Sequence, residues 1–266
     1  MDGAGLSKVA GRAGGARVAL LGATGTIGRA TAAALLREGH AVSCFVRPET
    51  SVAGLPEGVD IRRVTLGDPA SIAGAGFRGE RFDAVISCMA SRSGVAEDAW
   101  AIDHRANLDV LTAAQAAGVG HFVLLSAICV QKPRLAFQHA KLAFEAALAG
   151  SGMGYAIVRP TAFFKSLSGQ IARVRDGRPF LIFGDGRLTA CKPISDRDLA
   201  TYLVGCLADE SRWNRILPIG GPGAAITPRD QGEALFAMLG RPPRFRSVPP
   251  GMLDLIAGGL GAVGRL

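Results

Sequence analysis

The sequence lacks the clusters of cysteine and histidine from which proteins build metal centres. Its five cysteines are odd in number and widely separated along 266 residues, and its four histidines are not spaced as metal ligands are. This excludes an iron–sulfur cluster and a disulfide framework, and it is typical of a reducing compartment. We predict no metal site in this chain.

Long apolar runs are also missing. No segment approaches the roughly 20 apolar residues that a membrane-spanning helix needs. Residues 1–16 are rich in glycine and alanine without an apolar core, which excludes a secretory signal and predicts a flexible tail. We therefore expect a soluble, cytoplasmic protein. The C-terminal segment PPGMLDLIAGGLGAVGRL either packs on the protein, touches a membrane surface or is cut short.

Runs of basic residues are absent although the chain is basic overall. The net charge is +8 and the isoelectric point is about 9.8. The lysines and arginines are scattered and are not interleaved with aromatic residues, so nucleic acid is not predicted as a partner. The phosphates or carboxylates of a smaller ligand fit this charge better.

What the sequence does contain is a regular alternation of strand and helix patterns. Residues 17–47 read as a strand, a glycine-rich turn, an Ala/Leu-rich helix and a second strand. Further strands are predicted to begin at Ile61, Phe82, His121 and Tyr155, with helices over 99–117 and 135–149. Apolar strands separated by helices of this length predict a Rossmann-like, doubly wound α/β fold with a parallel sheet.

The texture of the sequence changes after Pro160 to short strands and turns. We predict a tail over 1–16, a dinucleotide-binding Rossmann core over 17–160 and a smaller C-terminal substrate lobe over 161–266. Some elements of this lobe are expected to return to the core sheet. The lobe would close over the strand ends, where ligands of open α/β sheets bind.

The glycine-rich turn lies directly between the first strand and the first helix. In GATGTIG, Gly22 permits the tight turn, Gly25 lets a pyrophosphate approach the backbone, and Gly28 lets helix and strand pack closely. The helix N-terminus then faces the phosphates. This predicts a dinucleotide site whose residues are Gly22, Thr24, Gly25, Thr26, Ile27 and Gly28.

The residue after the second strand favours NADPH as the dinucleotide. An NAD site would place an acidic side chain there, whereas this chain has Arg47, whose guanidinium suits an additional phosphate. A solvated surface arginine is the alternative. Asp68, after the third strand, either accepts a hydrogen bond from the adenine amino group or caps the next helix.

Two later features carry a resemblance to a known family. Ser126 follows the fifth strand, and Phe137-x-x-x-Lys141 stands where many NAD(P)H enzymes have Tyr-x-x-x-Lys. With segments such as VRPTAFFKSL and ACKPIS, the chain resembles the NADPH-dependent divinyl chlorophyllide 8-vinyl reductases of the extended or atypical short-chain dehydrogenase/reductase superfamily. The members of that family continue beyond the position where this sequence ends, so we expect either an incomplete substrate pocket or a shortened chain.

The resemblance implies reduction of the 8-vinyl group of divinyl chlorophyllide or protochlorophyllide to ethyl, in chlorophyll or bacteriochlorophyll biosynthesis. Reducing a carbonyl requires a tyrosine acid, but hydride addition to a vinyl group forms no alkoxide. Phe137 is then expected to pack against nicotinamide or chlorin. Lys141, the expected catalytic residue, would bind the nicotinamide ribose hydroxyls. Whether it also relays the proton is left open, and the other proton sources are water and, behind it, Cys129 or His139. Any magnesium would arrive with the substrate.

The resemblance extends to weaker candidates for the cofactor and substrate sites. Each has a plainer alternative as core, turn or solvated surface. The expected cofactor contacts are Cys88, Met89, Ser126, Pro160, Thr161 and Phe163. The expected substrate contacts are Phe137, Phe164 and Lys165, with Lys132 and Lys192 as other partners for a substrate carboxylate.

Two other functions stay open at this point. One is an isoflavone reductase-like NADPH reductase of a different conjugated substrate, which would share the isolated lysine. The other is a regulator or assembly factor that senses NADP(H) without catalysis, because Rossmann folds host both classes. The sequence leaves the oligomeric state undetermined, and peripheral contact with a pigment-making membrane is an open prediction.

Overall fold

The computed structural model describes residues 15–164 and 168–252, and its main feature is a seven-stranded parallel sheet. The strand order is β3-β2-β1-β4-β5-β6-β8, and each neighbouring pair is parallel. The strands are β1 (Arg17–Leu21), β2 (Ala41–Val46), β3 (Asp60–Arg63), β4 (Ala84–Ser87), β5 (His121–Leu125), β6 (Gly154–Pro160) and β8 (Arg215–Ile219). The predicted Rossmann-like α/β fold is confirmed.

The order of the strands determines where a ligand can bind. The chain moves outward from β1 to β3, then crosses back to β4 beside β1 and continues in the opposite direction. The carboxyl ends of β1 and β4 therefore form the topological switch point, which is the position where open α/β sheets bind their ligands.

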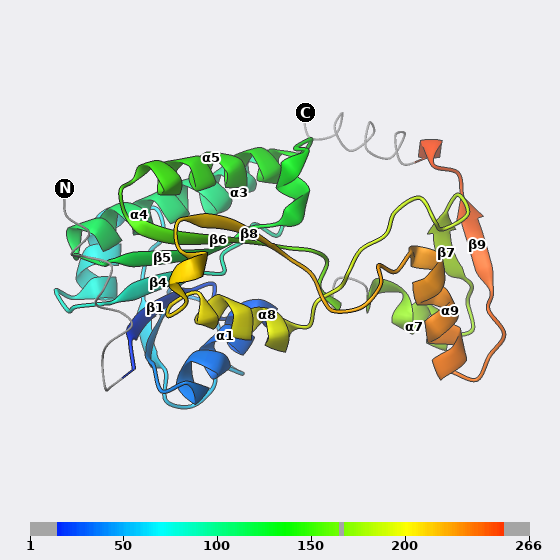
Figure 1. The fold of residues 1–266 in the computed structure, drawn as a ribbon, viewed down its shortest axis with the longest axis horizontal. Coiled ribbons are helices and arrows are strands. Elements are labelled where there is room, and N and C mark those ends of the chain that lie inside the picture. Colours follow the sequence, from blue (N-terminus) through cyan, green and yellow to red (C-terminus); the bar gives the residue numbers. More distant parts are fainter. Residues whose placement is uncertain (1–14, 165–167, 253–266) are drawn as a thin grey trace. The chain divides into compact units, whose positions relative to one another are not determined.

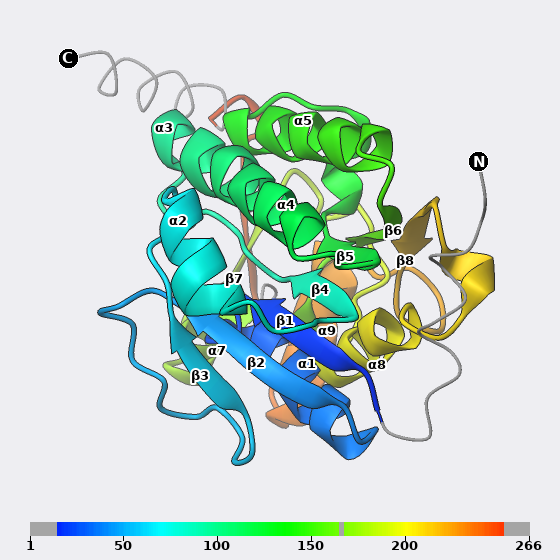
Figure 2. The same cartoon turned by 90° about the vertical axis from the view of Figure 1, so that its left-hand side faces the viewer.

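Helices cover both faces of the sheet, as Figure 2 shows. One face carries α1 (Thr26–Arg37) packed against α8 (Asp196–Gly205). The other carries α4 (Asn107–Ala116) and α5 (Ala136–Gly150). Shorter helical segments are α2 (Pro69–Ser71), η2 (Ile72–Phe77), α3 (Ala96–Ala99), η3 (Trp100–Ala106), η4 (Ile128–Gln131) and η6 (Glu210–Arg212).

The central strands are apolar because both of their faces are covered. Strands β4 and β5 are buried along their whole length. Beneath α5, the ring of Phe122 on β5 lies 5.7 Å from that of Phe144 in an edge-to-face contact. This packing holds α5 against the sheet and so fixes the position of the polar residues on the helix relative to the strands.

The helix expected over 99–117 is longer and less regular than its pattern indicated. It begins at Ala96, is π-helical over Trp100–Ala106, and continues as α4 to Ala116. The amide of Asn107 donates to the carbonyls of Ile102 at 3.0 Å and of Asp103 at 3.3 Å. These side-chain bonds stabilise the wider π turn, a feature that is frequent at functional sites.

The chain divides into two compact units. The first runs to Pro160 and also includes Asp196–Ile219, so that α8 and β8 belong to the sheet unit. The second comprises Thr161–Ser195 and the described residues from Gly220 onward. No helix among the described residues is long and apolar enough to cross a membrane.

The second unit has its own small core. Its elements are η5 (Ser168–Gln170), α7 (Ile171–Arg175), β7 (Phe180–Phe183), α9 (Pro228–Met238) and β9 (Phe245–Val248), with β7 and β9 paired in parallel (Figure 1). Val174, Phe180, Ile182 and Phe236 are buried together at its centre.

Candidate cofactor site

The glycine-rich turn is shaped as the sequence predicted. Gly22 has a φ of +70°, and a Cβ atom there would lie 2.5 Å from the carbonyl carbon and oxygen of Cys88. At Gly28 a Cβ atom would lie 2.1 Å from the carbonyl oxygen of Gly22. Larger residues would therefore separate β1, β4 and α1.

The start of α1 is prepared for an anion. Gly25 is the N-cap, no side chain caps the helix, and its first turn contains no acidic residue. The amide groups of the first turn are therefore not capped by a carboxylate of their own helix, and the helix dipole favours negative charge at this end. Thr24 and Thr26 are half-buried beside this turn, and Ile27 is buried.

Two arginines lie near this turn. Arg47 is exposed directly after β2. Arg92 Nη2 lies 3.9 Å from the position that a Cβ atom on Gly25 would take. Hydrogen bonds from Ser93, and to a smaller extent the charge of Arg47, hold the pKa of Asp98 below its usual value. Arg92 therefore borders the glycine turn, and Arg47 follows β2 at the same edge of the sheet, because Leu21 of β1 pairs with Phe45 of β2.

Asp68 has the capping role that was the alternative for it. Its carboxylate accepts from the amide of Ala70 at 3.0 Å, as the N-cap of α2. The expected adenine contact stays a prediction.

The end of β4 forms the wall beside the glycine turn. The Cys88 backbone lies against Gly22, and its sulfur lies 3.8 Å from the hydroxyl of Thr31. Burial raises the pKa of Cys88 to about 12, opposed by the hydrogen bond with Thr31 and by the charge of Lys141. Met89 is 5% exposed and belongs to the core cluster, so its side chain has the structural role that was its alternative.

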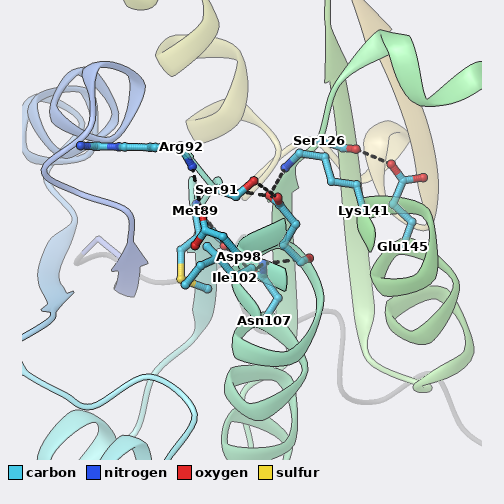
Figure 3. A network of polar contacts seen from close by, with 11 residues as sticks. Met89, Ser91, Arg92, Asp98, Ile102, Asn107, Ser126, Lys141 and Glu145 are labelled. Carbon is cyan, nitrogen blue, oxygen red and sulfur yellow. Dashed lines mark hydrogen bonds and ion pairs between the residues drawn. The ribbon is translucent and has the colours of Figure 1, made fainter. Parts of the chain in front are cut away.

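Lys141 is buried and has a carboxylate partner. Its Nζ lies 2.9 Å from Oδ1 of Asp103, and the side chains are 10% and 1% exposed. Oδ2 of the same carboxylate accepts from the Ser91 hydroxyl at 2.6 Å. Asn107, one helical turn after Asp103, accepts from Ser87 at 2.6 Å through Oδ1. Figure 3 shows this network, which joins α5 to the end of β4.

Ser126 takes part in a second buried network. Its hydroxyl donates to Oε1 of Glu145, one helical turn after Lys141, and Arg159 on β6 pairs with the same carboxylate. Ser126, Glu145 and Lys141 are all buried. The serine hydroxyl therefore has a structural acceptor, and its contact with a cofactor stays a prediction.

Phe137 lies at the start of α5, one turn before Lys141. Residues four positions apart share a helix face, so the half-buried ring lies on the side of α5 that carries the lysine ammonium. The proton-donor candidates Cys129 and His139 are exposed.

The remaining predicted residues lie at or beyond the end of the first unit. Pro160 ends β6, opposite Ile219 of β8. In the second unit the Thr161 hydroxyl donates to the carbonyl of Lys192, Phe163 forms a bridge with Ile194, and Phe164 is 54% exposed. Lys165 lies outside the described residues.

Sequence patterns did not reveal most of the partners in these networks. They are Ser87, Ser91, Arg92, Asp103, Asn107, Glu145 and Arg159. Spacing gave a signal for Glu145 alone, which follows Lys141 by one helical turn, because Asp103 lies on a different helix from Lys141. Among the described residues, no group of three or more His, Cys, Asp or Glu is placed to hold a metal ion.

A family model described as NAD(P)H-binding matches residues 22–210. The chain belongs to this family. The match begins at the first glycine of the turn and includes Arg47, Asp103 and Lys141. A nicotinamide dinucleotide is therefore the cofactor. Gly22 and Gly28 allow β1, β4 and α1 to pack closely, whereas a Cβ atom on Gly25 would lie 3.3 Å from the carbonyl oxygen of Gly22 and 3.9 Å from Arg92 Nη2, which leaves the more open approach to the backbone that a pyrophosphate needs.

Curated relatives confirm the resemblance noted in the sequence. The chloroplastic divinyl chlorophyllide a 8-vinyl-reductase of Oryza sativa subsp. indica is 49% identical over 89% of this chain, and that of Zea mays is 45% identical over 94%. The chain spans 62% and 66% of the lengths of these relatives. An NADPH-dependent quinone oxidoreductase of Escherichia coli shares the fold, with 20% identity, a TM-score of 0.72 and coverage of 87% of this chain and 78% of its own.

Proposed function

We propose that this protein uses NADPH to reduce the 8-vinyl group of divinyl chlorophyllide or protochlorophyllide to ethyl. The observation that carries the proposal is the similarity to 8-vinyl-reductases at 45–49% identity over 89–94% of the chain. The presence of Phe137 where a carbonyl reductase needs a tyrosine acid supports it, because a vinyl group gives no alkoxide to protonate.

Different residues are proposed to bind different parts of the coenzyme. The glycine turn and the N-terminus of α1 bind the pyrophosphate, and Arg47 binds the phosphate that distinguishes NADPH from NADH. Lys141 donates to the hydroxyls of the nicotinamide ribose and so fixes which face of the ring is presented. When bound, NADPH would supply the hydride for the terminal vinyl carbon, and the inner vinyl carbon would then take a proton from water, Cys129 or His139.

The second unit is proposed to hold the pigment. Phe164 exposes an aromatic ring and Lys192 is a candidate cation for a propionate carboxylate. Phe137, in the first unit, was also predicted as a substrate contact, and that contact stays a prediction. A large, flat, conjugated substrate with carboxylate groups suits side chains of these types.

The test is to mix the purified protein with divinyl chlorophyllide, or with the protochlorophyllide, and either NADPH or NADH. The blue absorption band should shift and a monovinyl product should appear on chromatography with NADPH, and little should appear with NADH. Consumption of NADPH only by small conjugated aromatic compounds would favour an isoflavone reductase-like activity. Binding of NADPH with no consumption by any pigment would favour a sensor or assembly factor.

A further inference from the structure

We propose that Asp103 is the positioning residue for Lys141, and that its carboxylate holds the lysine ammonium at the hydroxyls of the nicotinamide ribose. The inference rests on the role proposed above for Lys141. Lysine has a flexible side chain with four rotatable carbon bonds, and holding its ammonium at one place costs conformational entropy. Enzymes with Tyr-x-x-x-Lys have a tyrosine hydroxyl beside this lysine, whereas Phe137 has none.

The geometry of Asp103 suits this task. Its carboxylate is fixed on the Oδ2 side by the hydroxyl of Ser91 at 2.6 Å and its amide at 3.4 Å. Its Oδ1 is left to face Lys141 Nζ at 2.9 Å. Oδ1 is buried and contacts the ammonium as a charged pair at 2.9 Å. A lysine ammonium has three N–H groups, so a contact with one carboxylate oxygen leaves the others for the ribose hydroxyls.

The position of Asp103 also connects the lysine to the other wall of the site. Asp103 lies in the π-helical segment Trp100–Ala106, which packs against α5. Through Ser91 its carboxylate also holds the loop that follows β4, and Ser87 at the end of β4 is bonded to Asn107 in the next turn. One buried carboxylate thus sets the separation between the lysine and the strand end along which the cofactor runs.

A purely structural ion pair makes a different prediction from a positioning residue. If the ion pair only stabilises the fold, removing it lowers the binding affinity of every ligand of the cofactor site to a similar degree. If Asp103 positions Lys141, removing Asp103 lowers the affinity of ligands that contain the nicotinamide ribose and leaves the affinity of ligands that contain only the adenosine half unchanged. The two halves of NADPH therefore discriminate between the roles.

The experiment measures dissociation constants by calorimetry for NADPH and for adenosine 2′,5′-bisphosphate, with wild-type protein, Asp103→Asn, Lys141→Met and the double variant. We expect each single variant to raise the dissociation constant of NADPH about 10- to 100-fold, which corresponds to the loss of a hydrogen bond from a charged donor. The bisphosphate should keep its affinity within about twofold. The double variant should be no weaker than Lys141→Met, because Asp103 acts through the lysine.

Glu97→Gln is the matched control, because it removes an exposed carboxylate from α3, the helix immediately before the π-helical segment. It should leave both affinities unchanged. If Asp103→Asn does not fold, Ser91→Ala replaces it, with a smaller loss for NADPH and none for the bisphosphate.

Equal weakening of both ligands, no weakening of NADPH, or additive losses in the double variant would overturn the inference. No pigment is present in these measurements. A protein that passes this test but reduces no vinyl group would therefore refute the proposed activity and leave the role of Asp103 intact.

Discussion

The ammonium of Lys141 lies 2.9 Å from Oδ1 of Asp103, and the carboxylate is 99% shielded from solvent. A buried ion pair contributes little net stability, but separating its partners leaves an uncompensated buried charge. The lysine ammonium therefore stays beside the carboxylate, near the end of β4. Where many NAD(P)H enzymes have a tyrosine four residues before the lysine, this chain has Phe137, and the carboxylate beside Lys141 belongs to Asp103.

The first prediction concerns the two residues of the Phe-x-x-x-Lys motif. Lys141→Met should lower kcat/KM for vinyl reduction by about 100-fold or more, because the nicotinamide ring loses its fixed orientation. Phe137→Tyr should stay within about threefold of wild type, because the reaction develops no alkoxide for a phenol to protonate. Steady-state rates with NADPH and divinyl chlorophyllide measure both. A strong gain or loss in Phe137→Tyr would show that the proton step passes through this position.

Arg47 should determine the choice between NADPH and NADH. Arg47→Ala should lower the affinity for NADPH about 10- to 100-fold and leave the affinity for NADH nearly unchanged, because only NADPH carries the additional phosphate. Fluorescence titration with both coenzymes measures this. Arg81→Ala is the control, because Arg81 is an exposed arginine near the opposite ends of the strands, before β4. Equal loss for both coenzymes would assign Arg47 to the fold rather than to the phosphate.

Gly28 should tolerate no side chain. Gly28→Ala places a Cβ atom 2.1 Å from the carbonyl oxygen of Gly22, so α1 must move away from β1. We expect the free energy of unfolding to fall by about 1–3 kcal/mol. Most of the coenzyme binding should also be lost. Gly74→Ala, where the new Cβ would lie within 4 Å of no atom beyond its chain neighbours and its own helix backbone, should be neutral or stabilising by up to about 1 kcal/mol. Urea unfolding of the two variants tests the contrast.

The stability of the protein should depend on pH through His121. Burial lowers the pKa of His121 from 6.5 to about 4 in the folded state. Between these values the unfolded chain binds a proton that the folded chain does not, so the stabilising contribution is complete above pH 6.5 and is lost as the pH falls towards 4.

The matched variant is His121→Phe, which keeps an aromatic ring against Trp213, whose ring lies 5.2 Å away. Wild-type unfolding free energy should fall by on the order of 2–3 kcal/mol between pH 7 and 4.5, and the variant should lose less. Parallel pH profiles for the two proteins would contradict the assignment to His121.

Local patterns predicted the parts of the fold that local chemistry determines. The strands from Arg17 onward and the turn from Gly22 to Gly28 follow from apolar runs and from glycine geometry, which require no knowledge of the rest of the chain. Lys141 was predicted because the sequence around it resembles a family motif. Its partner Asp103 was not predicted, because the contact between them depends on how two helices pack in three dimensions.

The irregular parts of the structure escaped prediction for a related reason. The π-helical turn around Asp103 depends on side-chain bonds from Asn107, which a 3.6-residue periodicity does not express. Ser126 was predicted as a cofactor contact, and only the structure shows that Glu145 accepts its hydroxyl. Buried polar networks of this kind are decided by tertiary neighbours rather than by sequence spacing.

The most direct test of the account follows the hydride itself. Divinyl chlorophyllide is incubated with the protein and NADPH that carries deuterium at both positions of the nicotinamide C4, and the product is examined by mass spectrometry and NMR. We predict a monovinyl product with a single deuterium on the terminal carbon of the new ethyl group. A monovinyl product without deuterium, or bound NADPH that yields no product, would contradict it.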